Sequence, residues 1–136
     1  MESVERKPVI LAPRQGRNYD CGRMHAVFKA DGIETGSRYS VSEWWLDPNS
    51  GGPGAHSHEA NDELFLVIEG RPSILVAETW HQLQAGSFLM IPAKTIHDFE
   101  NRTTAPAGLF NVFIPGGFEE NMPGIVEWFL RSAEAR

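Results

Sequence analysis

Three histidines and one glutamate in this chain have the types and the spacing of a metal-binding site. His56 and His58 stand two residues apart, Glu63 follows after a short gap, and His97 lies further along the chain. On a β-strand, residues two apart point to the same face, and a neighbouring strand can bring Glu63 and His97 to the same point. Three imidazoles and one carboxylate suit a first-row divalent ion. The pattern therefore predicts a reactive metal centre.

The donor atoms narrow the choice of metal. The chain has one cysteine, Cys21, so a thiolate-rich site of the kind that selects Cu(I) is not expected. Imidazole and carboxylate ligands suit Fe, Mn, Ni, Co and Zn as divalent ions, and all five remain candidates. A six-coordinate ion would keep two adjacent positions open, for a bidentate oxygen ligand or for one oxygen donor plus O2. Such an ion stabilises an enolate or catecholate as a Lewis acid.

Short strands must position these side chains, because turn signals interrupt the chain every eight to fifteen residues. The apolar or alternating runs between the turns are rich in Val, Ile, Phe and Trp, and they cover residues 38–46, 62–69, 73–77, 87–91, 97–102 and 107–114. Many short strands with regular turns predict an all-β sandwich or barrel.

The last segment departs from this pattern. Asn121 is a candidate N-cap with Pro123 in the first turn. The apolar residues that then recur at helical spacing are Ile125, Val126, Phe129 and Leu130. We expect a short C-terminal helix over about residues 121–134, packed on the outside of the β-structure. Residues 1–136 are expected to form one domain, with the metal-binding core at about 37–115.

Composition argues against several classes of partner. Eighteen acidic residues against twelve basic ones give a net charge of −6, without a Lys/Arg cluster, which disfavours nucleic acid and anionic membranes. No apolar run approaches membrane-spanning length, and the N-terminus lacks the long apolar stretch of a signal peptide. A single cysteine forms no intrachain disulfide and fits a reducing compartment. We therefore expect a cytoplasmic protein.

Two of the expected strands carry apolar side chains on both faces. In the strand over residues 63–69, Phe65 and Val67 share a face with Glu63, while the opposite face is also apolar. The strand over residues 107–114 behaves in the same way. A sheet that is buried on both faces needs a second layer outside it. The tail helix supplies part of that layer and a second subunit would supply the rest, so we predict a homodimer.

Taken together, these positions resemble the cupin superfamily, specifically the small single-domain cupins. Both cupin motifs are matched at fixed spacing, the first by His56, His58, Glu63 and Gly70, and the second by Gly86, Pro92, His97 and Asn101. Ser50 stands where the first motif opens with glycine, and Lys94 occupies a glycine position of the second. If position 94 needs a positive φ, a lysine there is strained by about 1 kcal/mol or more, and a shifted turn would avoid the strain.

The resemblance implies a double-stranded β-helix, or jelly-roll barrel, with the metal inside it and the three histidines and Glu63 as its ligands. Glu63 is preferred over Asp62 because neighbouring strand residues point to opposite faces. Glu63 is also the expected catalytic residue, since a ligand carboxylate can act as general base in cupins that resemble quercetin dioxygenases. Asn101 is expected to hold a loop by hydrogen bonds.

Strand parity indicates what else lines the barrel. Phe65 and Val67 follow Glu63 inward and Phe99 follows His97, so these three are the candidate substrate-binding residues. Two strands leave their inward sets open, Glu43 and Trp45 or Ser42 and Trp44 in one, and Phe88 and Met90 or Ser87, Leu89 and Ile91 in the other. An interior of Phe, Met and Trp favours an aromatic or apolar small-molecule substrate.

Two classes of function agree with this pattern. The first is a metal-dependent oxidoreductase of the dioxygenase kind, acting on a small enol, diketone or polyphenol chelated through two oxygens. Cupin isomerases and decarboxylases use the same site without O2. The second is a non-catalytic cupin that binds a small ligand or a metal. Retention of all four ligands favours the enzyme, since a scaffold that binds only organic ligands needs no metal.

Overall fold

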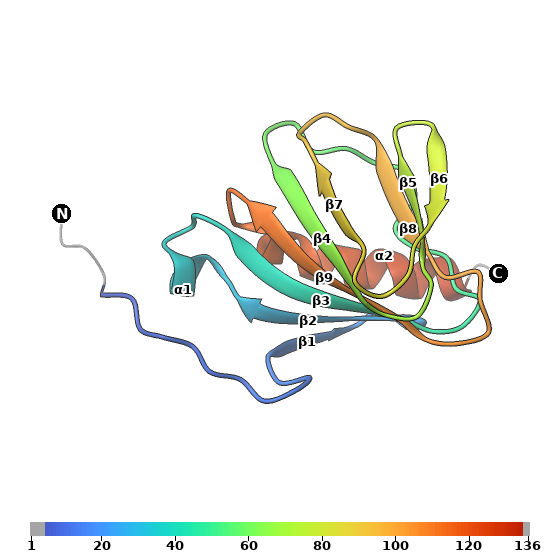
Figure 1. Ribbon diagram of the computed structural model, residues 1–136. Helices are drawn as coiled ribbons and strands as arrows, with labels where there is room; N and C mark the ends of the chain where they lie inside the picture. The colour runs from blue at the N-terminus through green and yellow to red at the C-terminus, as the bar shows by residue number, and fades with distance from the viewer. Residues whose placement is uncertain (1–4, 135–136) are drawn as a thin grey trace.

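Antiparallel strands are the main secondary structure of this computed structural model, which describes residues 5–134 (Figure 1). A six-stranded sheet has the order β1-β2-β3-β9-β4-β7, and a three-stranded sheet has the order β6-β5-β8. The strands of the large sheet are β1 (Arg17–Asp20), β2 (Met24–Ala30), β3 (Ser40–Leu46), β9 (Ala107–Ile114), β4 (Asp62–Glu69) and β7 (Phe88–Ile91). Those of the small sheet are β6 (Thr79–Gln82), β5 (Ser73–Val76) and β8 (His97–Glu100). The helices are α1 (Gly32–Thr35), the short 3₁₀ helix η1 (Phe118–Asn121) and α2 (Met122–Glu134).

The two sheets share one core, in which aromatic rings from both meet. The ring of Phe99, on β8 of the small sheet, lies 6.0 Å from that of Trp44 on β3 and 6.1 Å from that of Phe65 on β4. Burial alternates along the central strands of the large sheet, as expected for strands with one face on a core. The all-β prediction is confirmed, and the six predicted strands are all present.

The burial of alternate side chains also shows which residues of β3 and β7 point inward, a choice that the sequence left open. On β3, Ser42 and Trp44 are buried, and on β7 the inward positions are Leu89 and Ile91. The alternatives point outward, so Phe88 and Met90 are exposed. Three further strands, β1, β2 and β6, lie outside the six predicted runs. The four residues of β1 are exposed or half-buried and carry no apolar alternation, so only their pairing with β2 makes them a strand.

The loop between β3 and β4 leaves the large sheet, runs along β8 of the small sheet and then returns to the large sheet at β4. It forms isolated antiparallel bridges from Ser50 to Asn101 and from His56 to His97. At Gly52 the approach is so close that a Cβ atom would lie 1.7 Å from the carbonyl oxygen of Phe99. Only glycine fits at such a contact.

Asn101 ties this loop to the rest of the chain, as predicted. Its side chain, almost completely buried, donates to the carbonyls of Leu46, Asp47 and Ala105 and accepts from the backbone N–H and the hydroxyl of Thr103. A buried amide that serves so many backbone groups holds a loop in a fixed shape.

The C-terminal helix packs against the β-structure with one side. Met122 is fully buried, and Ile125, Val126 and Phe129 contact the core. Leu130 does not belong to this face, because 46% of it is exposed, so its assignment to the packing stripe was wrong. No helix within residues 5–134 has the length and apolar character to cross a membrane.

Candidate metal centre

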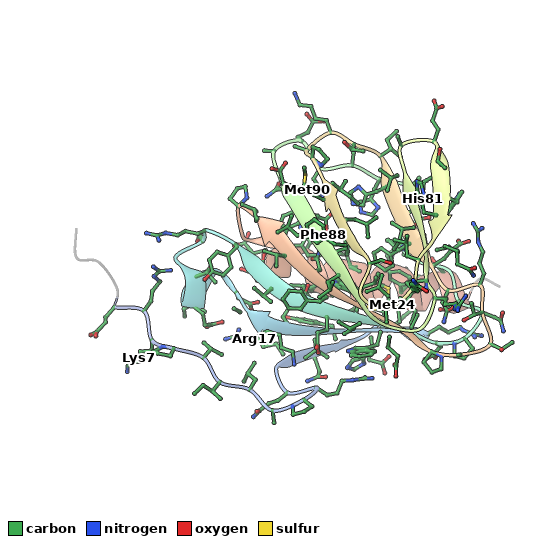
Figure 2. The ribbon with its side chains drawn as sticks, viewed as in Figure 1. Lys7, Arg17, Met24, His81, Phe88 and Met90 are labelled. Atoms are coloured by element: carbon green, nitrogen blue, oxygen red, sulfur yellow. The ribbon has the colours of Figure 1, made fainter. Side chains whose placement is uncertain are left out.

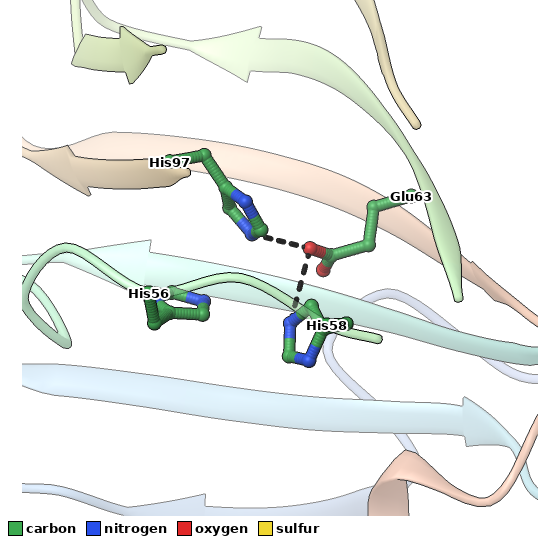
Figure 3. Close-up of side chains that lie close together, drawn as sticks. All are labelled: His56, His58, Glu63 and His97. Atoms are coloured by element: carbon green, nitrogen blue, oxygen red, sulfur yellow. Dashed lines mark ion pairs between the residues drawn. The ribbon is translucent and has the colours of Figure 1, made fainter. Parts of the chain in front are cut away.

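Three separate parts of the fold bring His56, His58, Glu63 and His97 together (Figure 3). Glu63 comes from β4 in the large sheet, and His97 begins β8 in the small sheet. His56 and His58 come from the loop that precedes β4, not from a regular strand as predicted. Their donor atoms and one Glu63 carboxylate oxygen all lie within 4.8 Å of one another.

Backbone hydrogen bonds give the loop histidines the alignment that a strand would have given them. His56 and His97 exchange backbone N–H to carbonyl bonds of 3.0 and 2.8 Å, so the two residues sit directly opposite each other. The carbonyl of His58 accepts from the N–H of Lys94 at 2.7 Å. The segment is thus extended and paired at both histidines, and their rings can turn to the same side.

Two of the imidazoles are fixed with a lone pair facing the cluster. His56 Nδ1 lies 2.7 Å from the carbonyl of Gly54, and His97 Nδ1 lies 2.9 Å from that of Thr95. A carbonyl only accepts, so both Nδ1 atoms carry the proton and, in the neutral rings, both Nε2 atoms present a lone pair. This arrangement of ring nitrogens is the usual one for metal-ligating histidines.

The inward atoms are buried and lack aligned hydrogen-bond partners, which fits a bound cation. His58 Nε2, Glu63 Oε2 and His97 Nε2 all belong to this group. Glu63 Oε2 lies 2.5 Å from His97 Nε2 and 3.4 Å from His58 Nε2. Lone pairs that converge at such distances repel each other unless a proton or a metal ion lies between them. The donor set is also the one expected for a first-row divalent ion.

Charge within the cluster sets its protonation in the metal-free protein. Burial raises the pKa of Glu63, but the adjacent His58 and His97 outweigh this and bring it to about 2. Burial lowers the pKa of His97, but the carboxylate of Glu63 raises it more, so it lies above its ordinary value. Burial keeps the pKa of His56 below its ordinary value. Without metal, Glu63 is therefore ionised, and His97 keeps its second proton to a higher pH than an ordinary imidazole does.

The structure separates the two neighbouring carboxylates. Glu63 is buried and faces the histidines, whereas Asp62 is exposed and accepts from the N–H of Ala93 at 2.8 Å. Lys94, in the same turn, has a φ of 72°, so the lysine does occupy the left-handed conformation that favours glycine. The strained residue is the one whose backbone N–H donates to the carbonyl of His58.

The three candidate substrate-binding residues lie in the core around the cluster. Phe65, Val67 and Phe99 are 2%, 1% and 6% exposed. They point inward as predicted, and their contact with a substrate stays a prediction. Two further aromatic rings lie nearer the donor atoms, because the ring of His58 is 4.9 Å from that of Phe113 and 5.8 Å from that of Phe118.

Sequence reasoning missed three residues that support the site. Asp98, buried beside His97, accepts from the N–H of Gly54 at 3.1 Å and so fixes the loop that carries His56. Asn111 donates to Glu63 Oε1 at 3.3 Å. Phe118 belongs to η1, which follows the last strand. Parity places Asn111 on the inner face of β9, and this is the one signal in the sequence that could have identified it.

Comparison with known proteins identifies the family. The model of the cupin domain matches residues 42–113, more than half of the chain, so the chain belongs to the cupin family and the predicted double-stranded β-helix fold is confirmed. Quercetin 2,3-dioxygenase of Bacillus subtilis (strain 168) is 29% identical over 99 residues, which are 70% of this chain. The match spans only 28% of that relative's length.

Solved structures agree on the fold. An RmlC-like cupin from Shewanella frigidimarina superposes with a TM-score of 0.70 at 17% identity, over 86% of this chain and 99% of that one. A predicted oxalate decarboxylase from Thermotoga maritima superposes with a TM-score of 0.69 at 15% identity, over 80% and 99%. At these identities the likeness concerns the fold alone.

The first prediction tests which side chains bind the metal and which only lie close to it in the sequence. His58→Ala removes an inward nitrogen and should lower metal occupancy sharply with little change of fold, because the ring is a partly exposed loop side chain. Asp62→Ala, the matched control, should leave occupancy unchanged because its carboxylate faces away. Elemental analysis of the purified variants measures both. Loss of metal from Asp62→Ala with retention in His58→Ala would contradict the assignment.

The second prediction concerns pH. Below the raised pKa of His97, metal binding must displace the Nε2 proton of that ring, whereas Glu63 is already ionised and releases none. Affinity for Co(II) should therefore rise with pH until His97 is deprotonated without metal, and level off above that point. Titration calorimetry between pH 6 and 9, in buffers of different ionisation enthalpy, measures affinity and proton release. A pH-independent affinity without proton release would refute this account.

Proposed function

We propose that this cupin is a metal-dependent oxidoreductase of the dioxygenase kind, acting on a small enol, diketone or polyphenol. The main support is the cluster of three histidines and Glu63, whose buried inward atoms have no aligned hydrogen-bond partner. The similarity to a quercetin dioxygenase adds to it over the matched part of that protein. Cupin membership alone leaves the reaction open, because function depends on the site and not on the fold.

His56, His58, Glu63 and His97 would hold a divalent ion of Fe, Mn, Ni, Co or Zn. When bound, such an ion supplies Lewis acidity that stabilises an enolate or catecholate, and a redox-active one also supports reaction with O2. The protein provides neutral imidazoles and one carboxylate, which leave net positive charge at the centre. That charge favours substrates that lose a proton on binding.

Glu63 is the residue that we assign to proton transfer. Its carboxylate is ionised at neutral pH and its Oε2 faces the centre of the cluster. If Glu63 left the metal, a substrate hydroxyl placed beside Oε2 could pass its proton there, and general-base catalysis of this kind needs hydrogen-bond contact between the two oxygens. The proton would then remain on Glu63 until the product leaves.

The aromatic surroundings favour a planar, apolar substrate. Phe113 and Phe118 lie with ring centroids 4.8 Å apart beside His58, and Phe65 and Phe99 lie deeper in the barrel. Aromatic side chains bind flat rings by stacking and edge contacts. We therefore propose that Phe65, Val67 and Phe99 form the inner wall against the substrate.

The third prediction tests the reaction. Metal-stripped protein reloaded separately with Fe(II), Mn(II), Ni(II), Co(II) or Zn(II) should consume O2 with a flavonol or a 1,3-diketone in at least one redox-active form. Glu63→Gln should lower the rate by at least about 100-fold, because proton transfer by a positioned side chain contributes about that much. An oxygen electrode with product analysis measures this. Metal uptake without O2 consumption in any form would favour an isomerase, a decarboxylase or a binding protein instead.

We also propose that the protein is a homodimer. The outer face of β4, β7 and β9 exposes Leu66, Phe88, Met90 and Ile114, with Phe88 and Met90 on the edge strand β7 (Figure 2). Phe88 is 64% and Met90 55% exposed. Contiguous apolar surface of this kind is typical of protein interfaces.

The fourth prediction tests that surface. Wild-type protein should have twice the mass of one chain by light scattering at micromolar concentration, and Phe88→Glu should shift it to the mass of one chain, because a charge would enter the apolar contact. Thr79→Glu on β6, an exposed strand of the other sheet, serves as control and should remain dimeric. A wild-type mass of one chain would exclude the dimer.

A further inference from the structure

We propose that Asn111, itself oriented by Ser42 and Trp44, is a positioning residue that holds one oxygen of Glu63 so that only the other faces the three histidines. The inference rests on the proposed metal centre, in which Glu63 is a ligand. It adds to that centre a chain of three buried side chains that belong neither to the cupin motifs nor to the ligand set.

The register of the large sheet places these residues side by side. Asn111 on β9 stands opposite Ser42 on β3 and opposite Phe65 on β4. Glu63 lies two residues before Phe65 and therefore on the same inner face. Ser42 is 1% exposed and Asn111 3%. The chain thus runs across three adjacent strands inside the core, away from solvent.

The hydrogen bonds of this chain have a single possible direction. The indole Nε1 of Trp44 lies 3.0 Å from Ser42 Oγ, and because an indole only donates, Ser42 must accept there. The hydroxyl proton of Ser42 is then free for Asn111 Oδ1 at 3.3 Å. With Oδ1 accepting, the amide nitrogen of Asn111 must face the other way, towards β4.

The amide nitrogen of Asn111 is fully used on that side. It donates to Glu63 Oε1 and to the carbonyl of Leu64, both at 3.3 Å. An NH2 group has two hydrogens, so the rotation of the side chain is fixed by its own bonds. Glu63 Oε1 and the Leu64 carbonyl only accept, so they require the nitrogen end of the amide, and the hydroxyl of Ser42, which accepts from Trp44, holds the oxygen end.

The carboxylate of Glu63 is thereby divided into two different oxygens. Oε1 accepts from Asn111, whereas Oε2 lies beside His58 and His97 and has no aligned partner. A neutral donor on Oε1 stabilises the carboxylate without bringing a second charge into the core. It also favours binding through Oε2 alone, which leaves room at the centre for a bidentate substrate.

The test is a Co(II) titration of metal-stripped protein, followed by its visible absorption spectrum. Asn111→Leu keeps the branched shape of the side chain but leaves Oε1 without a donor. We expect about 10- to 100-fold weaker Co(II) binding, as is usual for residues that support a ligand, and a changed band shape because Glu63 can now turn and bind through both oxygens. Ser42→Ala keeps Asn111 but removes the hydrogen bond to its Oδ1, so that the amide is held at its nitrogen end alone. Loss of this bond should weaken Co(II) binding by about 2- to 10-fold.

Two controls separate positioning from loss of stability. Leu109→Ala removes a fully buried side chain from the same face of β9, so it destabilises the core without touching Glu63. It should leave affinity and spectrum unchanged at a temperature at which it is folded. Glu63→Gln marks the effect of altering the ligand itself.

The results distinguish this inference from the metal centre on which it rests. Weaker binding with an altered spectrum in Ser42→Ala and Asn111→Leu, but not in Leu109→Ala, would support the inference. Co(II) binding that is weaker in Glu63→Gln than in the wild type, but unchanged in Ser42→Ala and Asn111→Leu, would overturn this inference and leave the metal centre standing. Equal weakening in Leu109→Ala would overturn it too. Wild-type protein that takes up no Co(II) would overturn the metal centre and the inference together.

Discussion

The structure depends on one unfavourable contact, the convergence of imidazole nitrogens and a carboxylate oxygen at a point inside the protein. Burying such acceptors without donors costs free energy, so something must hold them there. Backbone carbonyls at Gly54 and Thr95 orient two of the rings, and the N–H of Lys94 holds the third histidine. The sheets supply the rest, because pairing of β4 with β9 and of β8 with β5 brings Glu63 and His97 from opposite sides. A cation at this point would remove the cost.

The ligand cluster could be predicted from the sequence because its members are chemically distinctive and regularly spaced. Parity then chose Glu63 over Asp62 and placed Phe65, Val67 and Phe99 inside. The secondary structure at His56 and His58 was wrong, because alternation in the sequence does not distinguish a regular strand from an extended loop with isolated bridges. The predicted set of strands was also incomplete, since β1 is a strand only through its pairing with β2.

The supporting residues could not be predicted because they have no pattern of their own. Asp98 and Asn111 are ordinary polar residues within strands, and their roles arise from contacts with segments far away in the chain. Phe118 reaches His58 only because η1 folds back over the barrel. Lys94 shows the converse case. The motif left a positive φ or a shifted turn open there, and the lysine adopts the positive φ in spite of the strain.

The contact at Gly52 has a consequence for how the protein can change over time. Because the loop lies against β8 with no space for a methyl group, a mutation at this one position would push away the segment that carries two of the histidines. The exposed side chains of β6 have no such restriction. Tolerance to substitution therefore differs strongly between positions. Exposed side chains of this kind can be replaced, whereas Gly52 cannot. A glycine without any chemical function is in this sense as restricted as the histidines beside it.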